Sequence, residues 1–288
     1  MRIANLCAWT MASLLTLSGP LAMAEDVAGK PVPRGMGFQR AVTEVARDTE
    51  WLDDFLHLIA ILISAFVMIL MLIVIVRYNR RANSKPSSFT HNPVLEVTWT
   101  AVPALILIVI AVPSLRLLFL QLDVPEPDLT IKATGNQWFW SYEYPGKDIE
   151  FDSFMIGQGS AGVTEDVKAQ LEENGYTEED YLFATDTRVV VPVDAVVHVL
   201  VTASDVVHNW MVPSFGTKID AVPGRTNETW FRAEETGVFY GQCSELCGKD
   251  HAYMPIVVEV VPQEEFDKWV QTQQAKNGTS GTKLAATQ

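Results

Sequence analysis

Positively charged residues are scarce in this sequence. Its 288 residues include 21 Lys and Arg against 35 Asp and Glu, which gives a net charge of −14. This balance excludes a nucleic-acid-binding protein, because the phosphate backbone requires a basic surface. With 48% hydrophobic residues, the chain is also too apolar to be a disordered acidic protein. The acidic and apolar residues must therefore lie in different segments.

Cysteine is also rare, with three residues in the whole chain. Residues 1–24 combine a basic start, an apolar run and a small residue at Ala24, a pattern that predicts a cleaved export signal. An uncleaved membrane anchor is the alternative. Cleavage would remove Cys7 and leave Cys243 and Cys247, so no odd thiol would remain in the exported chain.

Charged residues are missing from residues 55–76, and Arg116 is the only one within residues 97–120. Each run is long enough to cross a hydrocarbon core as a helix, so we expect a two-helix transmembrane hairpin. Buried core helices are the alternative. Between the runs, residues 77–96 carry several Arg and Lys and no acid before Glu96. The positive-inside rule therefore places this loop in the cytoplasm and both termini outside.

The acidity belongs to the region that follows, since residues 122–288 contain 27 acidic and 11 basic residues. A basic partner or plain solubility would explain it equally well. Within residues 121–275, short alternating segments rich in valine predict a β-sandwich or barrel, with helices after Thr164 and from Pro262. We expect residues 25–54 to form an exported N-terminal segment, loosely ordered as far as residue 50, and residues 276–288 to form a flexible tail.

The segment "YGQCSELCGKDHAYMP" contains two thiols, an imidazole and a thioether within residues 240–255. A disulfide is possible in an exported protein, but it would leave the imidazole and the thioether unexplained. Cys, His and Met ligands suit copper, whereas zinc more often takes Cys and His alone. A second imidazole is available at His208, before Pro213, although an ordinary strand histidine is the alternative there.

Two thiolates can bridge two metal ions, with one imidazole on each ion and with the thioether and a backbone carbonyl as weak outer ligands. This ligand set predicts a two-copper centre. An electron shared by two equivalent coppers changes each bond length only slightly, so electron transfer would be fast. No open coordination position is implied, which argues against substrate chemistry in this domain.

Nearly the whole chain after residue 24 resembles subunit II of the heme-copper cytochrome c oxidases, of the α-proteobacterial and mitochondrial type. The resemblance rests on "FTHN", "LEVTWTAVPALIL", "GNQWFWSYEY", "FDSFMI", "SDVVHNWMVPSFGTKIDAVPGR" and "FYGQCSELCGKDHAYMPIVVEVV". It implies a membrane-anchored all-β protein, in which a two-helix transmembrane hairpin is followed by a cupredoxin-like β-sandwich.

The resemblance also implies the ligands of the dinuclear copper site that this family calls CuA. The matching residues are the bridging thiolates Cys243 and Cys247, the imidazoles His208 and His251, the thioether Met254 and the backbone carbonyl of Glu245. The carboxylate of Glu245 matches a ligand of a magnesium ion shared with subunit I. Without the resemblance, this carboxylate would be interpreted as an exposed loop acid.

In "QWFWSYEY", strand alternation puts Trp138 on one face with Trp140, Tyr142 and Tyr144. A packed sheet face is the simple explanation of this pattern. The resemblance adds a role for Trp138, as the exposed residue at which electrons enter above the copper site. Asn136 departs from the pattern, because many relatives have His there, so a tuning role of that side chain is in doubt.

Other acidic residues have roles that the resemblance implies. Glu96, at the cytoplasmic start of the second apolar run, matches a glutamate at the mouth of a proton-uptake pathway into subunit I. Candidate acids for docking a lysine-ringed cytochrome c are Glu143, Asp148, Asp152, Asp186 and Asp205. Docking of this kind accelerates encounter and weakens with salt.

The resemblance implies the function of an electron-accepting subunit of cytochrome c oxidase. Electrons from cytochrome c would reach the two coppers and then heme in subunit I, where oxygen is reduced to water and protons are translocated. The implied partners are subunit I, other oxidase subunits, cytochrome c and a bacterial inner membrane. The chain would be multi-pass, with its copper domain in the periplasm.

Three other functions remain as alternatives. An anchored copper chaperone or free-standing electron carrier would leave Glu96 and the aromatic strand unexplained. Subunit II of a quinol oxidase lacks the copper ligands that this chain has. Nitrous oxide reductase shares the copper motif but not the membrane hairpin. A fused cytochrome c tail is excluded because no C-x-x-C-H follows residue 251.

Overall fold

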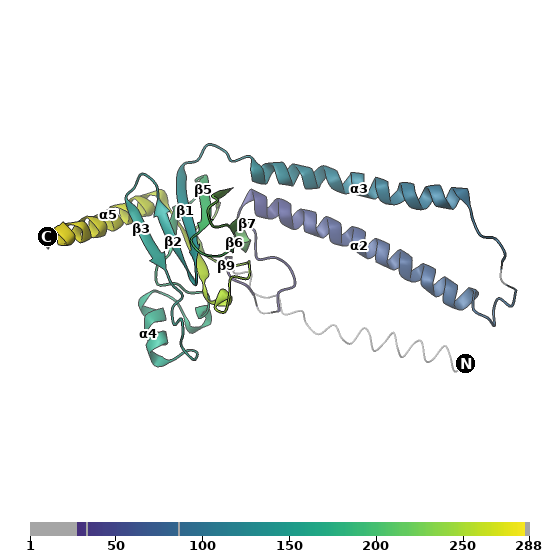
Figure 1. Cartoon of the computed structure of the whole chain (residues 1–288), viewed down its shortest axis with the longest axis horizontal. Helices are drawn as coiled ribbons and strands as arrows, with labels where there is room; N and C mark the ends of the chain where they lie inside the picture. The colour runs from purple at the N-terminus through teal and green to yellow at the C-terminus, as the bar shows by residue number, and fades with distance from the viewer. Residues whose placement is uncertain (1–27, 33, 86, 286–288) are drawn as a thin grey trace.

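The structure is a computed structural model that describes residues 28–32, 34–85 and 87–285. The predicted signal at residues 1–24 and Cys7 therefore lie outside the described residues. Two long helices, α2 (Glu44–Arg77) and α3 (Pro93–Leu122), form a hairpin that projects from a sheet-rich domain (Figure 1). They contain the two predicted apolar runs and extend beyond them at both ends.

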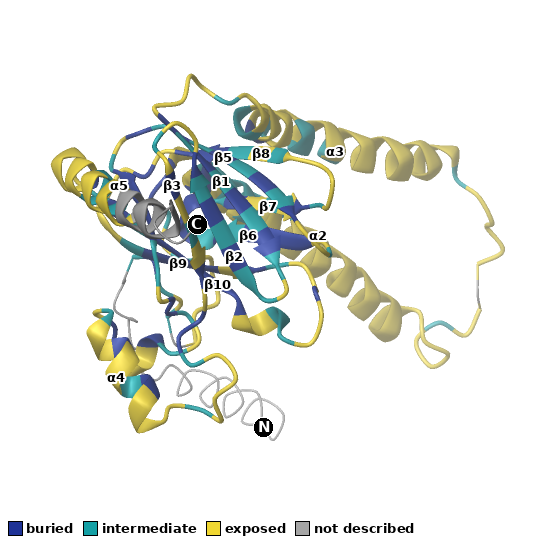
Figure 2. Ribbon diagram, turned by 60° about the vertical axis from the view of Figure 1, so that its left-hand side comes forward, coloured by how far each residue is buried: buried dark blue, intermediate teal, exposed yellow. Residues whose placement is uncertain are grey.

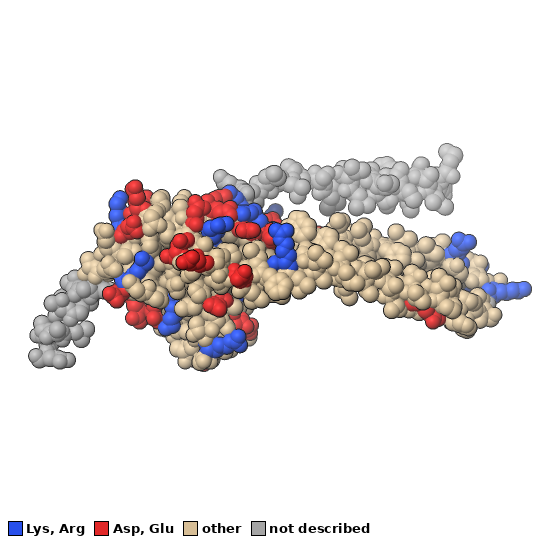
Figure 3. Space-filling model, turned by 90° about the horizontal axis from the view of Figure 1, so that it is seen from above, with Lys and Arg blue, Asp and Glu red and all other residues tan. Residues whose placement is uncertain are grey.

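The apolar surface of this hairpin faces outward. No residue is buried in the most apolar stretch of α2, and only 6% are buried in that of α3. Figure 3 shows an uncharged middle of the hairpin between an acid-rich domain and basic residues at the far end. Helices that are apolar all round require an apolar environment, so both helices are candidate membrane spans.

Helix α2 begins at Glu44, whereas the sequence predicted a loosely ordered lead as far as residue 50. The Thr43 hydroxyl caps the helix by accepting a hydrogen bond from the Ala46 backbone N–H (3.0 Å), and it donates one to the Phe215 carbonyl (2.8 Å). Val45 and Ala46 are buried, so the first helical turn packs into the sheet domain. Packing against distant residues stabilises a turn that the local composition did not indicate.

The domain consists of two five-stranded sheets packed face to face (Figure 2). One sheet has the order β3 (Ile149–Ser153), β2 (Phe139–Tyr144), β1 (Leu129–Asn136), β5 (Val197–Ala203) and β8 (Asn227–Phe231). The other has the order β4 (Val189–Pro192), β10 (Pro255–Val261), β9 (Gly237–Cys243), β6 (His208–Val212) and β7 (Thr217–Ala221). The predicted β-sandwich is confirmed. The valine-rich alternation does not extend to β3 and β7, because both are five-residue strands with charged residues on their exposed face.

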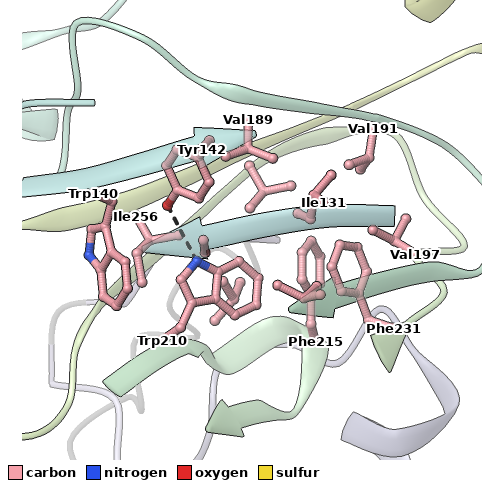
Figure 4. Packing of buried hydrophobic residues seen from close by; sticks show 14 of the residues in the cluster. Ile131, Trp140, Tyr142, Val189, Val191, Val197, Trp210, Phe215, Phe231 and Ile256 are labelled. Atoms are coloured by element: carbon pink, nitrogen blue, oxygen red, sulfur yellow. Dashed lines mark hydrogen bonds between the residues drawn. The ribbon is translucent and has the colours of Figure 1, made fainter. Parts of the chain in front are cut away.

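Aromatic side chains fill the space between the sheets (Figure 4). Trp140 and Tyr142 of β2 are fully buried, as are Trp210 of β6 and Phe231 of β8. Trp210 Nε1 donates a hydrogen bond to the Tyr142 hydroxyl (3.3 Å), which links strands of opposite sheets. Burial of several such rings dominates the energetics of a core of this size.

Between β3 and β4 the chain leaves the sandwich, and residues 157–182, here called the excursion, form a small unit of their own. Helix α4 (Glu165–Glu173) buries Val167 and Leu171 against Tyr240. The Lys30 ammonium pairs with the buried Asp180 carboxylate, which ties the N-terminal segment to the excursion. The excursion is therefore packed onto β9 and is not a free loop.

At the C-terminus, α5 (Gln263–Ala285) is helical through most of the segment that the sequence predicted as a flexible tail, residues 276–288. The sequence anticipated the first part of this helix from Pro262. Continuous backbone hydrogen bonding can extend a helix beyond the residues with an apolar face. Flexibility of residues 276–288 stays a prediction.

The Tyr144 hydroxyl is expected to contribute more to stability than the neighbouring Tyr142 hydroxyl. It donates to the Val190 carbonyl (2.9 Å) and accepts from the Val190 N–H (3.0 Å), joining β2 to the edge strand β4. Tyr144→Phe should lower the free energy of unfolding by about 1–3 kcal/mol, because two buried backbone groups lose their partner. Urea unfolding of the detergent-solubilised chain, followed by tryptophan fluorescence, measures this change.

The control is Tyr142→Phe, which removes a single longer hydrogen bond from an equally buried ring and should cost less. If both variants lost the same free energy of unfolding, the proposed contribution of the Tyr144 link between β2 and β4 would be contradicted.

Candidate metal centre

The potential ligands lie at one end of the second sheet. Cys243 ends β9, and Pro255 begins β10, which returns antiparallel beside it with Pro255 opposite Gln242. The intervening loop therefore closes on itself and brings Cys247, His251 and Met254 back toward Cys243. Strand β6, adjacent to β9 in the same sheet, supplies His208 from its first residue.

The two cysteines are free thiols, although both are buried. Their Sγ atoms are 3.8 Å apart, well beyond the length of about 2.05 Å of a disulfide bond. Cys247 Sγ lies 3.5 Å from Met254 Sδ and 3.6 Å from His251 Nδ1. Cys243 Sγ lies 3.9 Å from His208 Nδ1 and 3.3 Å from the Glu245 carbonyl oxygen.

These contacts divide into two groups, one around each sulfur. Cys243 faces one imidazole and one backbone carbonyl, while Cys247 faces one imidazole and one thioether. The ligand atoms of His208, Cys243 and Cys247 all lie within 4.8 Å of one another. Soft sulfur donors with imidazoles suit copper, and two thiols with two imidazoles, a thioether and a carbonyl offer enough donors for two ions.

His208 is fully buried and is held from two sides. Gly135 of β1 packs against the ring, since a Cβ atom at this glycine would lie 2.8 Å from His208 Cδ2. The other ring nitrogen, Nε2, lies 2.9 Å from Asp205 Oδ1. Burial alone would lower the pKa of His208, but its contacts with Cys243 and Asp205 raise the pKa above its ordinary value.

The two thiols differ in acidity. Burial would raise the pKa of Cys243, but contacts with His208 and with the backbone of Asn209 and Glu245 lower it to about 7. Burial and the neighbouring Cys243 sulfur raise the pKa of Cys247 to about 12. The metal-free pair therefore approaches one negative charge only as the pH rises above about 7, and ligation of a metal by both sulfurs requires removal of a further proton from Cys247.

Trp138 lies in the turn between β1 and β2 and not on the face of β2, which begins at Phe139. The prediction that Trp138 shares a strand face with Trp140 was therefore wrong, because the hairpin turn interrupts the alternation. The half-buried indole donates a hydrogen bond from Nε1 to the Cys247 carbonyl (3.3 Å), and the Gln137 side chain donates to the same oxygen (2.8 Å). Sequence patterning missed Gln137.

Comparisons with known proteins agree with this geometry. The family model for the periplasmic domain of cytochrome c oxidase subunit II matches residues 129–261, and the model for its transmembrane domain matches residues 31–117. The chain is 47% identical over 279 residues to cytochrome c oxidase subunit 2 of Cereibacter sphaeroides, covering 95% of this chain and 91% of that one. The chain belongs to the cytochrome c oxidase subunit II family.

Other relatives include cytochrome c oxidase subunit 2 of Branchiostoma floridae, 44% identical over 239 residues, with 82% of this chain and 95% of that one covered. Among solved structures, the periplasmic domain of subunit II of Bradyrhizobium japonicum cytochrome oxidase is 50% identical. The matched region covers 54% of this chain and 99% of the Bradyrhizobium japonicum chain, with a TM-score of 0.45. Family membership confirms the expected fold class, a membrane-anchored, cupredoxin-like β-sandwich, and implies copper at the site.

The acids that the subunit II resemblance suggested for docking have intramolecular contacts. Glu143 pairs with Lys132 (2.6 Å), and Asp152 accepts a hydrogen bond from the Ser141 hydroxyl (2.6 Å). Asp186 accepts one from the Phe154 N–H, and burial raises the pKa of Asp186. Asp148 is exposed in the turn between β2 and β3, and Asp205 binds His208.

Three further residues complete the expected set. Asn136 bridges Ser204 to Ser141 by hydrogen bonds of 2.6 and 3.0 Å, so its side chain connects β1 to neighbouring segments. The Glu245 side chain is exposed, and its backbone carbonyl alone faces Cys243. Glu96 is exposed in the first turn of α3, at the loop end of the hairpin. Their roles in subunit II proteins stay predictions for this chain.

Gly135→Ala is expected to reduce copper binding. The added methyl group would meet three atoms of His208 at 2.8–3.0 Å, and the fully buried ring has no room to withdraw. Overpacking should cost about 1–3 kcal/mol and displace Nδ1 from Cys243. Copper per chain after reconstitution measures the effect, and circular dichroism verifies folding.

Gly37→Ala is the control, because a Cβ atom at Gly37 meets nothing within 4 Å. Unchanged copper content in Gly135→Ala would show that this close packing does not position His208.

Proton release on metal binding should depend on pH. At about pH 8.5, above the pKa of Cys243 and below that of Cys247, Cu(I) binding should displace about one thiol proton. At about pH 5.5 both thiols and His208 are protonated, so at least two protons should leave. A titration at constant pH counts them.

Cys247→Ser is the control, because it removes the thiol that supplies the proton at the higher pH. Equal release at both pH values in the unmodified chain would contradict the unequal acidity of the two thiols.

Proposed function

We propose that this chain is the electron-accepting subunit of a cytochrome c oxidase, which takes electrons from cytochrome c at a dinuclear copper centre. The observation that carries the proposal is the convergence of donor atoms on the two buried free thiols, at 3.3–3.9 Å from a sulfur. Electrons would pass on to heme in subunit I. Reduction of oxygen to water and coupled proton translocation belong to that partner.

The chain's residues divide the work of holding copper. Cys243 and Cys247 would hold two copper ions between them, and His208, His251, Met254 and the Glu245 carbonyl would supply the remaining donors. Bound copper supplies a one-electron change of oxidation state. The protein excludes water, since both cysteines, His208 and Met254 are buried, and the strand ends hold the donors in fixed positions.

Trp138 is the proposed residue at which electrons enter. Its indole is partly exposed on one side and hydrogen-bonded to the Cys247 carbonyl on the other. This contact provides a short path of bonded atoms from the surface to a thiol ligand. A lysine-ringed donor is favoured by the negative charge of the domain, and Glu143, Asp148, Asp152 and Asp186 are candidates for attracting it.

The hairpin suggests how the subunit sits in its complex. Helices α2 and α3 would pack in the inner membrane beside subunit I, with the copper domain and both termini in the periplasm. Glu96 would then lie at the cytoplasmic surface, where protons are taken up. The exposed Glu245 carboxylate would be free to bind magnesium together with subunit I.

Copper content and electron paramagnetic resonance on the full-length chain in detergent test the proposal. The whole chain is needed because Val42 and Thr43 are buried in the sheet domain, and a fragment starting after the hairpin would lose them. Two coppers per chain are expected, with hyperfine structure from one electron shared by both nuclei. Ferrocytochrome c should reduce this centre rapidly in stopped-flow experiments.

Two variants serve as controls. Cys247→Ser should abolish the shared-electron spectrum, because a single bridging sulfur remains. Trp138→Phe should retain both coppers and accept electrons from ferrocytochrome c much more slowly. One localised copper, or none with Cys243 bonded to Cys247, would reject the proposal in favour of an anchored copper chaperone.

A further inference from the structure

Asp205 lies between β5 and β6, three residues before His208, and its two carboxylate oxygens have different partners. Oδ1 lies 2.9 Å from His208 Nε2 and accepts the Val206 N–H at 2.6 Å. Oδ2 accepts the Gln137 backbone N–H at 2.8 Å, across 68 residues of sequence. Both oxygens are therefore committed within the protein.

The contact with His208 decides which ring nitrogen is free to bind a metal. A neutral imidazole has one N–H donor and one lone-pair acceptor. Because Asp205 accepts from Nε2, the proton is held there and the lone pair lies on Nδ1, the atom that faces Cys243. His208 is fully buried, so water cannot readily replace Asp205 at Nε2.

The contact with Gln137 holds the turn that carries Trp138. The Gln137 side chain and the Trp138 indole both donate to the Cys247 carbonyl. The Asp205 carboxylate thus contacts His208, the imidazole that lies beside Cys243. It also holds the turn whose side chains bind the backbone of Cys247. Loss of Asp205 would loosen both connections at once.

We propose that Asp205 is a positioning residue of the metal centre, which sets the ligand nitrogen of His208 and anchors the Trp138 turn, and that it is not primarily a docking acid for the electron donor. The inference rests on the proposed function. Ligand imidazoles commonly depend on such a carboxylate partner, and its loss typically costs about 10–100-fold in metal affinity.

Asp152 provides a matched comparison. It is another acid suggested for docking, and its carboxylate accepts from the Ser141 hydroxyl on the outer face of β2 and β3. Among the described residues, no hydrogen bond or ion pair joins Asp152 to a proposed copper ligand. A purely electrostatic docking role would give the two acids similar effects, whereas a positioning role would separate them.

The test compares Asp205→Asn and Asp152→Asn in the full-length, copper-loaded chain with no donor present. Asparagine has nearly the shape of aspartate, but it offers one acceptor oxygen where the carboxylate offers two. Asp205→Asn should lower copper affinity about 10–100-fold and change the hyperfine pattern and the reduction potential. Asp152→Asn should match the unmodified chain in all three measurements.

Donor kinetics separate the remaining outcomes. If Asp205→Asn keeps the affinity, spectrum and potential of the unmodified chain and changes only the salt-dependent rate of reduction by ferrocytochrome c, Asp205 is a docking acid and the inference is wrong. An unmodified chain that binds no copper pair would overturn both the proposed function and this inference. Normal copper in the unmodified chain with a normal Asp205→Asn spectrum overturns this inference alone.

A second measurement does not depend on the folding of a variant. Pulsed electron–nuclear double resonance on the unmodified, copper-loaded chain reports which His208 nitrogen keeps its proton. A proton on Nε2, slow to exchange with deuterium, supports the inference. Coordination through Nε2 with the proton on Nδ1 overturns it.

Discussion

Two buried thiols 3.8 Å apart cannot both ionise unless positive charge lies beside them. The raised pKa of Cys247, about 12, expresses this constraint, because the charge on Cys243 and the apolar surroundings both oppose a second thiolate. A bound cation reverses it and makes the doubly ionised pair favourable. The neighbouring groups suit this requirement, since the sulfurs contact imidazoles, a carbonyl, a thioether and each other, all of which can remain beside a bound cation.

The sandwich keeps these groups in place before any metal arrives. The proposed ligands are held at the ends of neighbouring paired strands. His208 begins β6, Cys243 ends β9, and β10 begins directly after Met254. The hydroxyl of Tyr144 and the indole of Trp210 join the two sheets across the core. Because α2 begins inside the domain, with Val45 and Ala46 buried there, the hairpin is packed directly against the sheet domain that carries the site.

Much of this could be predicted from the sequence, because it depends on local pattern. The apolar runs, most strands and the spacing of the Cys, His and Met residues are visible without a structure. The helical turn at Thr43 and the turn that removes Trp138 from the strand face were not, since distant packing decides them. The contacts of Asp205 were also invisible. A hydrogen bond across 68 residues leaves no periodic signal, so an acid in a loop reads as a surface charge.

The turn at Trp138 shows why the excursion matters to the site. The Gln158 side chain donates a hydrogen bond to the Trp138 carbonyl (2.9 Å), while Asp205 and the Cys247 carbonyl hold the same turn from other sides. Three anchors from separate segments therefore order this turn when the domain folds, and the indole is held against the Cys247 carbonyl within the folded chain itself. If Trp138 is the electron-entry residue proposed above, a transient donor would not have to spend its small binding energy on ordering it.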